Sequence, residues 1–354
     1  MSESTLNPVS GDDGFVRSAG GQLAKFAAYA VAGLALVIYL LSVVAGEAGS
    51  TISGNAIDYE NNAITIALRE EPPQLDANRA TDASSNVVLA HVMEGLLGYD
   101  IDAQLVPGVA ERYEIREDGA TFWLREDALW SDGVQVTARD FVFSWKRALD
   151  PETASQYAFI LYPVKNAEAI NRGELPVAML GVRAASDRIL EVDFERPTPY
   201  FDKLVAYLTY FPVREDFYNS TNGRYGADAD MLLYNGAYVL TDWVHGSTMR
   251  WVKNDKYWNR ENKGFLDEIH TAYITQDINA KLNLFKDGQI VDTHLLSPML
   301  PTAMEQRWQI DRSMDGSVFY LEFNHRDDRI TVSYTHLRAH ETGRNLVCRL
   351  LLEK

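Results

Sequence analysis

The body of this sequence lacks cysteine. The only cysteine of the 354-residue chain, Cys348, lies in a C-terminal segment, residues 333–354, that differs from the rest. The preceding residues therefore cannot form a disulfide framework or a cysteine-based metal site, and they offer no cysteine for lipid attachment. Residues 46–332 are long enough for roughly two domains with cores of their own.

Basic residues are also scarce. The chain has 33 lysine and arginine residues against 50 aspartate and glutamate residues, a formal net charge of −17 at pH 7. So acidic a protein repels the phosphate backbone of nucleic acids, and we expect no nucleic-acid partner. With 46% hydrophobic and 23% charged residues, the composition is that of a globular protein.

Motifs for catalysis are missing as well. There is no nucleophile elbow, phosphate-binding loop, dinucleotide-binding glycine motif or calcium-binding loop. The histidines before the C-terminal segment stand apart, without metal-ligand spacing: His91, His245, His270, His294 and His325. We therefore expect no enzyme activity, no metal and no cofactor. A membrane-anchored hydrolase or a sensor input domain stays open as a different class, although a hydrolase would need a nucleophile–base pair or a metal cluster.

One long apolar run is present, at residues 26–45, and it contains no charged residue. It is long enough to cross a bilayer as one helix. Arg17 and Lys25 precede it, so the positive-inside rule places residues 1–25 in the cytoplasm and the body outside. We expect a retained membrane anchor, with the body exported. The alternative is a signal segment that is cleaved after Ala45.

The C-terminal segment changes character abruptly. In residues 333–354 the acidic bias reverses, the only cysteine appears and the strand-like pattern stops. The string resembles translated sequencing-adapter read-through. We interpret it as an artefact and assign it no function.

Between these ends, the patterns predict both strands and helices. Strands are predicted at Ile64–Leu68, Ile189–Phe194 and Glu268–Ile274, and a hairpin from Tyr238–Leu240 and Thr248–Lys253. One helix is predicted at Asn86–Glu94. Another begins after Thr137, where Asp140 can complete a capping box and where Phe141 and Trp145 share an apolar face. Mixed elements without regular alternation indicate α/β or α+β layers.

Aromatic residues are abundant, and most of them suit core packing. Tyr157 is the exception, because it lies in a loop without helical periodicity, where a core role is less compelling. An aromatic ring with one polar end suits a mostly apolar cleft that needs a few hydrogen bonds.

Several strings of the body carry a family resemblance. They include TFWLREDALWSDGVQVTARDFVFSWKRALDPETASQYA, LGVRAASDRILEVDFERPTPYFDKLVAY and YNGAYVLTDWV, in order between about Ile64 and Asp328. The sequence resembles the oligopeptide-binding branch of the extracytoplasmic solute-binding proteins, family 5. The string WSDG-x-x-x-TA-x-DFVFSWKRALDP is long and specific.

The resemblance implies an α/β fold with two lobes that close over a ligand. This is the class II, or Venus-flytrap, form of the periplasmic binding proteins, with an extra inserted domain. After a linker at residues 46–61, lobe I would comprise residues 62–93 and 215–294, and the inserted domain residues 94–214. Residues 295–332 would only begin the second lobe, domain III, which is mostly missing.

The same resemblance implies an extracytoplasmic peptide-binding component of an ABC importer, periplasmic and monomeric. An extended oligopeptide would lie between the lobes and pair with protein backbone, and the loaded protein would dock on the inner-membrane permease subunits. Roomy, wet pockets would make selectivity for side chains weak. Other ligands stay open as alternatives: dipeptides, nickel chelates, haem and sugars.

Ligand-lining residues follow from the resemblance one position at a time. Thr81, Asp82 and Ala83 match the stretch before the first helix that lines the cleft, and Tyr157 matches a tyrosine that contacts the ligand. Family members often carry an acidic residue where Thr81 stands and a basic residue where Ala90 stands, and these two differences keep the other ligands open. The acidic anchor for the peptide amino terminus is expected in the missing second lobe. The motif residues are expected to be scaffold: Trp130, Asp132, Gly133, Thr137 and Asp140.

Overall fold

The computed structural model describes residues 29–30, 32–37, 39, 55–262 and 266–311. The predicted cytoplasmic tail and the C-terminal segment lie outside these residues. The described positions of the predicted membrane segment are helical. Within the described residues, no helix combines the length and the hydrophobicity that crossing a membrane requires.

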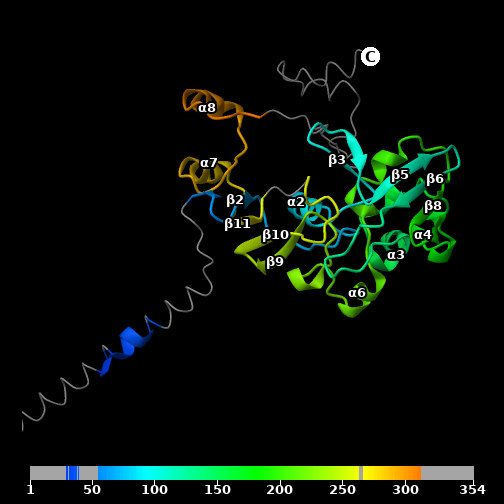
Figure 1. The fold of residues 1–354 in the computed structure, drawn as a ribbon, viewed down its shortest axis with the longest axis horizontal. Coiled ribbons are helices and arrows are strands. Elements are labelled where there is room, and N and C mark those ends of the chain that lie inside the picture. Colours follow the sequence, from blue (N-terminus) through cyan, green and yellow to red (C-terminus); the bar gives the residue numbers. More distant parts are fainter. Residues whose placement is uncertain (1–28, 31, 38, 40–54, 263–265, 312–354) are drawn as a thin grey trace, which may run out of the picture. The chain divides into compact units, whose positions relative to one another are not determined.

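The chain divides into two compact units, residues 1–294 and residues 295–354. The sheets described below belong to the first unit (Figure 1). In the second unit, the described residues include a short 3₁₀ helix at Ser297–Met299 and helix α8 (Leu300–Glu305).

A five-stranded mixed sheet is built around two strands that are far apart in the sequence. Its order is β1-β2-β11-β10-β9. Strands β2 and β11 pair in parallel, with Ile64 opposite Ile269, and the other neighbours are antiparallel. The strands are β1 (Ile57–Asp58), β2 (Ala63–Leu68), β9 (Tyr238–Val244), β10 (Thr248–Lys253) and β11 (Glu268–Ile274). The predicted hairpin is confirmed as β9 and β10. The strands predicted at Ile64–Leu68 and Glu268–Ile274 are confirmed as β2 and β11.

Helix α2 (Ala83–Val92) packs against this sheet beside β9. Gly236, just before β9, donates its N–H to the carbonyl of Val92 at 3.0 Å. A Cβ on Gly236 would lie 2.6 Å from backbone atoms of Val92 and Met93, so only glycine permits this approach. The absence of a side chain at Gly236 therefore allows the end of α2 to pack closely against the sheet.

A second, antiparallel sheet has the order β5-β6-β8-β7. Its strands are β5 (Ala110–Ile115), β6 (Gly119–Leu124), β7 (Val182–Ser186) and β8 (Ile189–Asp193). Helix α3 (Ala138–Leu149) packs on β7 and β8. It begins with the predicted capping box, in which the Thr137 N–H donates to Asp140 Oδ2 at 2.8 Å. Phe141 and Trp145 are fully buried, as their shared face predicted.

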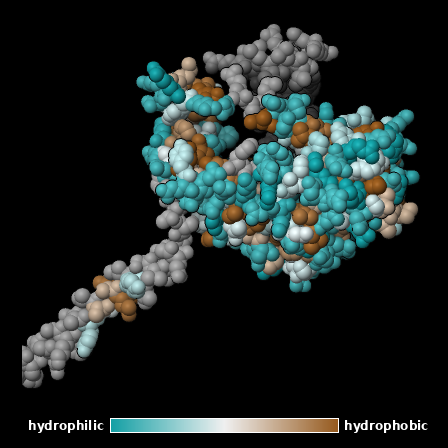
Figure 2. Space-filling view, in the orientation of Figure 1, coloured by the Kyte–Doolittle hydropathy of each residue, from teal (hydrophilic) through white to brown (hydrophobic). Residues whose placement is uncertain are grey.

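The remaining elements of the first unit are short. They are β3 (Leu97–Tyr99), β4 (Leu105–Pro107), α4 (Ala167–Asn171), α5 (Phe201–Leu204), α6 (Glu215–Ser220), α7 (Ile278–Lys286) and 3₁₀ helices at Pro151–Thr153, Ala158–Leu161, Val177–Met179, Leu208–Tyr210 and Ala229–Met231. A hydrophobic core runs through both sheets and includes Val88, Phe122, Trp145 and Trp251. The face in Figure 2 is mostly hydrophilic, with scattered hydrophobic residues.

Candidate functional site

The segment between β2 and α2 carries three of the predicted ligand-lining residues. Asp82 caps α2, because its carboxylate accepts the N–H of Ser85 at 2.8 Å and lies 2.6 Å from the Ser85 hydroxyl. This cap starts the helix at Ala83, earlier than the apolar pattern predicted. The Asp82 carboxylate thus serves the helix start, whereas Ala83 is exposed and Thr81 is half-buried beside it.

Tyr157, the fourth predicted residue, belongs to an aromatic cluster. Its ring stands edge-on to that of Tyr207, with centroids 5.7 Å apart, and lies 5.9 Å from that of Phe159. Burial, aided by the neighbouring Tyr157 hydroxyl, raises the pKa of Tyr207 to about 12. The Tyr207 phenol is therefore neutral near pH 7 and keeps its O–H donor. Sequence reasoning missed Tyr207 as a partner, because aromatic spacing does not show which rings meet.

The segments that carry Thr81 and Tyr157 are joined through a buried turn. Ser155 Oγ, close to Tyr157 in sequence, donates to the carbonyl of Asn78 at 2.5 Å. Asn78 Nδ2 in turn donates to Ser144 Oγ of α3 at 3.0 Å. Asn78 therefore links the segment before α2 to the segment before Tyr157.

A buried ion pair anchors the same turn. Arg147 of α3 contacts Asp76 with both ends of its guanidinium, at 2.9 Å between Nη1 and Oδ1 and 2.5 Å between Nη2 and Oδ2. Its Nη1 also donates to Asn78 Oδ1 at 2.8 Å. Burial opposes the charge of Arg147, but the hydrogen bond and the charge of Asp76 outweigh it, so the pKa of Arg147 is raised. Sequence analysis singled out none of these residues.

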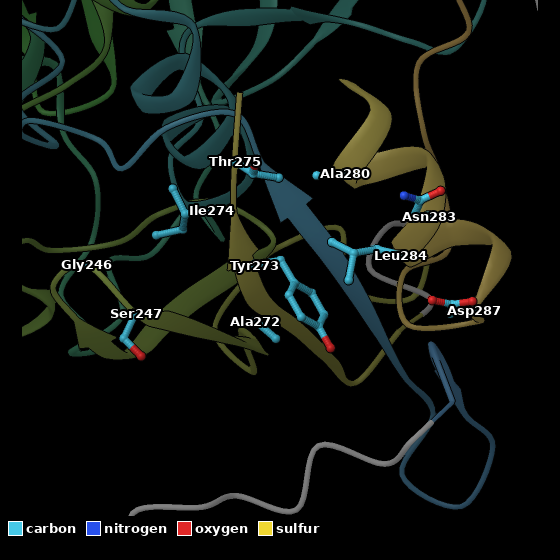
Figure 3. A pocket seen from close by; sticks show the side chains of 10 residues that line it. All are labelled: Gly246, Ser247, Ala272, Tyr273, Ile274, Thr275, Ala280, Asn283, Leu284 and Asp287. Atoms are coloured by element: carbon cyan, nitrogen blue, oxygen red, sulfur yellow. The ribbon is translucent and has the colours of Figure 1, made fainter. Parts of the chain in front are cut away.

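A pocket of about 490 Å³ opens beside this ion pair. Its lining combines charges of both signs with aromatic rings: Arg79, Lys146, Asp150, Glu152, Phe143 and Tyr218. A second pocket, of about 580 Å³, lies between the β9–β10 turn, β11 and α7 (Figure 3). There, Tyr273 of β11 donates to Gln289 Oε1 at 3.0 Å. The four predicted residues line neither pocket.

A charged cluster joins the β9–β10 turn to the loop after β2. His245 Nδ1 lies 2.7 Å from Glu71 Oε1, and its Nε2 lies 3.0 Å from Asp228 Oδ1. The Trp243 indole also donates to Glu71, at 3.1 Å. The hydrogen bond to Asp228 raises the pKa of His245, and the hydrogen bond to Glu71 adds to this effect while burial opposes it. A histidine that is isolated in sequence thus has two acidic partners in the fold.

The motif residues expected to be scaffold are engaged within the fold. The Trp130 indole is fully buried and donates to Asp140 Oδ2 at 3.2 Å. Asp132 pairs with Arg214 at 2.6 Å.

Within the residues that the structure describes, no group of three or more histidine, cysteine, aspartate and glutamate side chains is placed to hold a metal ion.

Comparison with known proteins identifies relatives of this chain. The profile of the bacterial extracellular solute-binding proteins, family 5 Middle, matches residues 104–338. The oligopeptide-binding protein OppA of Bacillus subtilis (strain 168) is 33% identical over 286 residues, which cover 79% of this chain and 52% of the relative. The periplasmic oligopeptide-binding protein OppA of Escherichia coli (strain K12) is 32% identical over 270 residues, covering 73% and 49%.

A solved structure shows the same similarity in three dimensions. Listeria monocytogenes OppA bound to peptide superimposes with a TM-score of 0.66 at 32% identity, covering 70% of this chain and 49% of that structure. The chain spans about half the length of the curated relatives that it matches.

Proposed function

Because this chain belongs to the bacterial extracellular solute-binding proteins of family 5, we propose that it is part of a receptor that delivers peptides to an ABC importer. The membership and the α/β fold of this class confirm the prediction from the sequence. The observation that carries the function is the 33% identity, over 79% of the chain, to a protein named for oligopeptide binding. The peptide in the Listeria structure supports the same class of ligand.

The proposed ligand is an extended peptide held mainly by its main chain. Backbone pairing of this kind is strand addition, which gives affinity without dependence on peptide sequence. Thr81 and Ala83 would border the peptide at the start of α2, and Asp82 would hold that start in place. The ring of Tyr157, supported edge-on by Tyr207, would provide apolar contact and a hydroxyl.

The proposed domain division assigns each sheet to a part of the receptor. Residues 62–93 and 215–294 would form lobe I, and the five-stranded sheet supports this because β2 comes from the first range and β9, β10 and β11 come from the second. Strand β1, at Ile57–Asp58, lies within the predicted linker and joins the same sheet. Residues 94–214 would form the inserted domain, which would contain the four-stranded sheet. Residues 295–332 would begin the second lobe, whose remaining part would close the ligand site.

The proposed cellular setting follows from the N-terminal pattern and the family. Residues 26–45 would hold the body at the periplasmic face of the inner membrane, or would be cleaved to release it. The loaded receptor would act as a monomer and dock on the ABC permease subunits. It would catalyse no reaction and use no cofactor.

Calorimetric titration of the complete gene product tests the function. Short peptides are expected to bind with micromolar or tighter affinity, in contrast to dipeptides, nickel chelates, haem and sugars. Tyr157→Ala should weaken peptide binding about fivefold, because an aromatic contact of this kind contributes about 1 kcal/mol. Tyr99→Ala is the matched control, since Tyr99 is exposed on β3, and it should leave affinity unchanged. Binding of another ligand class with no peptide binding would reject the proposal.

A further inference from the structure

Residues 75–80, which lead into α2, form a compact turn with buried polar side chains. Asp76 and Asn78 are 2% and 1% exposed. The carbonyl of Asp76 accepts the N–H groups of Arg79 and Ala80 at 2.9 and 2.8 Å. The Asp76 carboxylate also accepts the N–H of Asn78 at 3.1 Å. The direction in which the chain enters α2 therefore depends on how Asp76 and Asn78 are held.

Arg147 holds both of these residues with a single guanidinium. Its side chain is 9% exposed, and it donates to both carboxylate oxygens of Asp76 and to the side-chain oxygen of Asn78. The ring of Tyr218 lies 4.4 Å from the guanidinium carbon. A planar guanidinium with a two-pronged partner and an aromatic neighbour has little orientational freedom, and an ammonium group cannot reproduce this geometry.

The turn also forms hydrogen bonds with residues that lie two positions from each tyrosine of the candidate site. The Asn78 carbonyl accepts the hydroxyl of Ser155, close to Tyr157. Asn78 Nδ2 lies 3.2 Å from the carbonyl oxygen of Thr209, close to Tyr207. A displacement of Asn78 would therefore move the start of α2 relative to the tyrosine pair.

We propose that Arg147 is a positioning residue of the ligand site: by holding Asp76 and Asn78, it sets the placement of Thr81 and Ala83 relative to Tyr157. The inference rests on the proposed function, because it takes those three residues as ligand contacts. A role in stability alone explains the pair less well, since buried ion pairs are often no more stabilising than apolar replacements of equal volume. Beyond any contribution to stability, the guanidinium fixes the relative positions of Asp76 and Asn78.

Hydrogen–deuterium exchange of the 354-residue chain tests the positioning directly. Arg147→Lys keeps the positive charge beside Asp76 but cannot reach Asp76 and Asn78 with the same fork. We expect amides in residues 76–85 and 155–162 to exchange about tenfold faster, because local opening is governed by local contacts. Amides in β6 and β8 should keep their wild-type rates. Arg147→Met is a second variant, which should accelerate exchange in the same two segments. If it fails to fold, the exchange rates of Arg147→Lys still test the positioning role.

Arg125→Lys is the matched control. Arg125 also stacks on an aromatic ring, that of Trp258 at 3.5 Å, and its Nε donates to the Gly108 carbonyl at 2.7 Å. This substitution should leave exchange in both site segments unchanged. Unaltered exchange there in Arg147→Lys, or equal acceleration in β6 and β8, would overturn the positioning role.

Peptide titration of the complete gene product separates this inference from the proposed function. Arg147→Lys should weaken peptide affinity about tenfold while the melting temperature changes little, since a positioning role affects the site more than the core. If no peptide binds the wild type, the proposed function fails, and with it the role of Arg147 in a ligand site. If peptide binds and the variant matches the wild type in affinity and exchange, only the positioning inference fails.

Discussion

At the scale of single residues, burial raises the pH at which the carboxyl group of Asp140 ionises. Its carboxylate lies under the start of α3, where it accepts hydrogen bonds from the Thr137 N–H and the Trp130 indole. Burial raises the pKa of Asp140 from 3.8 to about 6, although these hydrogen bonds act in the opposite direction. The capping carboxylate therefore carries an energetic cost when it is ionised.

Asp140→Asn should remove this cost and change how stability depends on pH. The folded protein binds the proton of Asp140 more tightly than the unfolded chain, so this group's contribution falls as pH rises from about 4 to about 6. Asparagine does not titrate and keeps an oxygen for the Thr137 N–H. The free energy of unfolding of the variant, relative to wild type, should rise by about 2 kcal/mol between about pH 4 and pH 7. Urea denaturation at both pH values measures it, and parallel pH profiles would contradict it.

His245 should titrate above its ordinary value. Its pKa is raised from 6.5 because the imidazolium is held by Asp228 and Glu71. Its contribution to stability is therefore present in full below about 6.5 and is lost as pH rises through the raised pKa. NMR titration of the imidazole should give a midpoint above 6.5, and Asp228→Asn should lower it more than Glu71→Gln. A wild-type midpoint at or below 6.5 would show that the two contacts do not form in solution.

Single residues also show which parts of a site can be predicted from a sequence. The capping box of Thr137 and Asp140 was predicted, because its partners are neighbours in the chain. The pairing of Arg147 with Asp76 spans 71 positions, and nothing local indicates it. Thr81 and Tyr157 were selected through the family resemblance, and their role in binding remains a prediction.

At the scale of elements, local patterns predicted the strands and helices better than their pairing. The β9–β10 hairpin and α3 follow from alternation, turn residues and caps. The parallel pairing of β2 with β11 did not follow, because it joins strands that are distant in the chain. Helix α2 was predicted to start late, since its first turn is polar and the apolar pattern begins only after it.

The start of α2 gives a test at this scale. Asp82→Ala removes the oxygen that accepts the Ser85 N–H and should lower the free energy of unfolding by about 1 kcal/mol. Asp82→Asn keeps an acceptor at the same place and should change the free energy of unfolding by only about 0.3 kcal/mol. Chemical denaturation of both variants measures the difference. Equal losses would mean that the carboxylate contributes through its charge and not as the cap.

At the scale of the whole molecule, the residues that the structure describes share an extensive core. The chain spans about half the length of the relatives that it matches. The hydrophobic core joins the two sheets of the first unit. The chain covers 52% of the Bacillus relative and 49% of the Escherichia coli relative. In a receptor that binds peptide between two lobes, one lobe presents only half of the contacts.

Residues 46–332 alone should therefore bind peptide poorly. The fragment would carry the proposed lobe I and inserted domain, but it would leave the peptide exposed on the side where the second lobe closes. Loss of half of the backbone pairing and of water exclusion should weaken affinity well beyond micromolar. Isothermal titration of the fragment checks this, and micromolar or tighter binding would contradict it.

The central claim, capture of peptides by their main chain, is tested most directly by comparing three ligands on the complete gene product. They are a short peptide, the same residues in shuffled order, and the original peptide with its backbone nitrogens methylated. Isothermal titration should give similar affinities for the first two, within about threefold, and at least about a hundredfold weaker binding for the third. If shuffling abolishes binding while methylation leaves it intact, recognition depends on side chains and the account is contradicted.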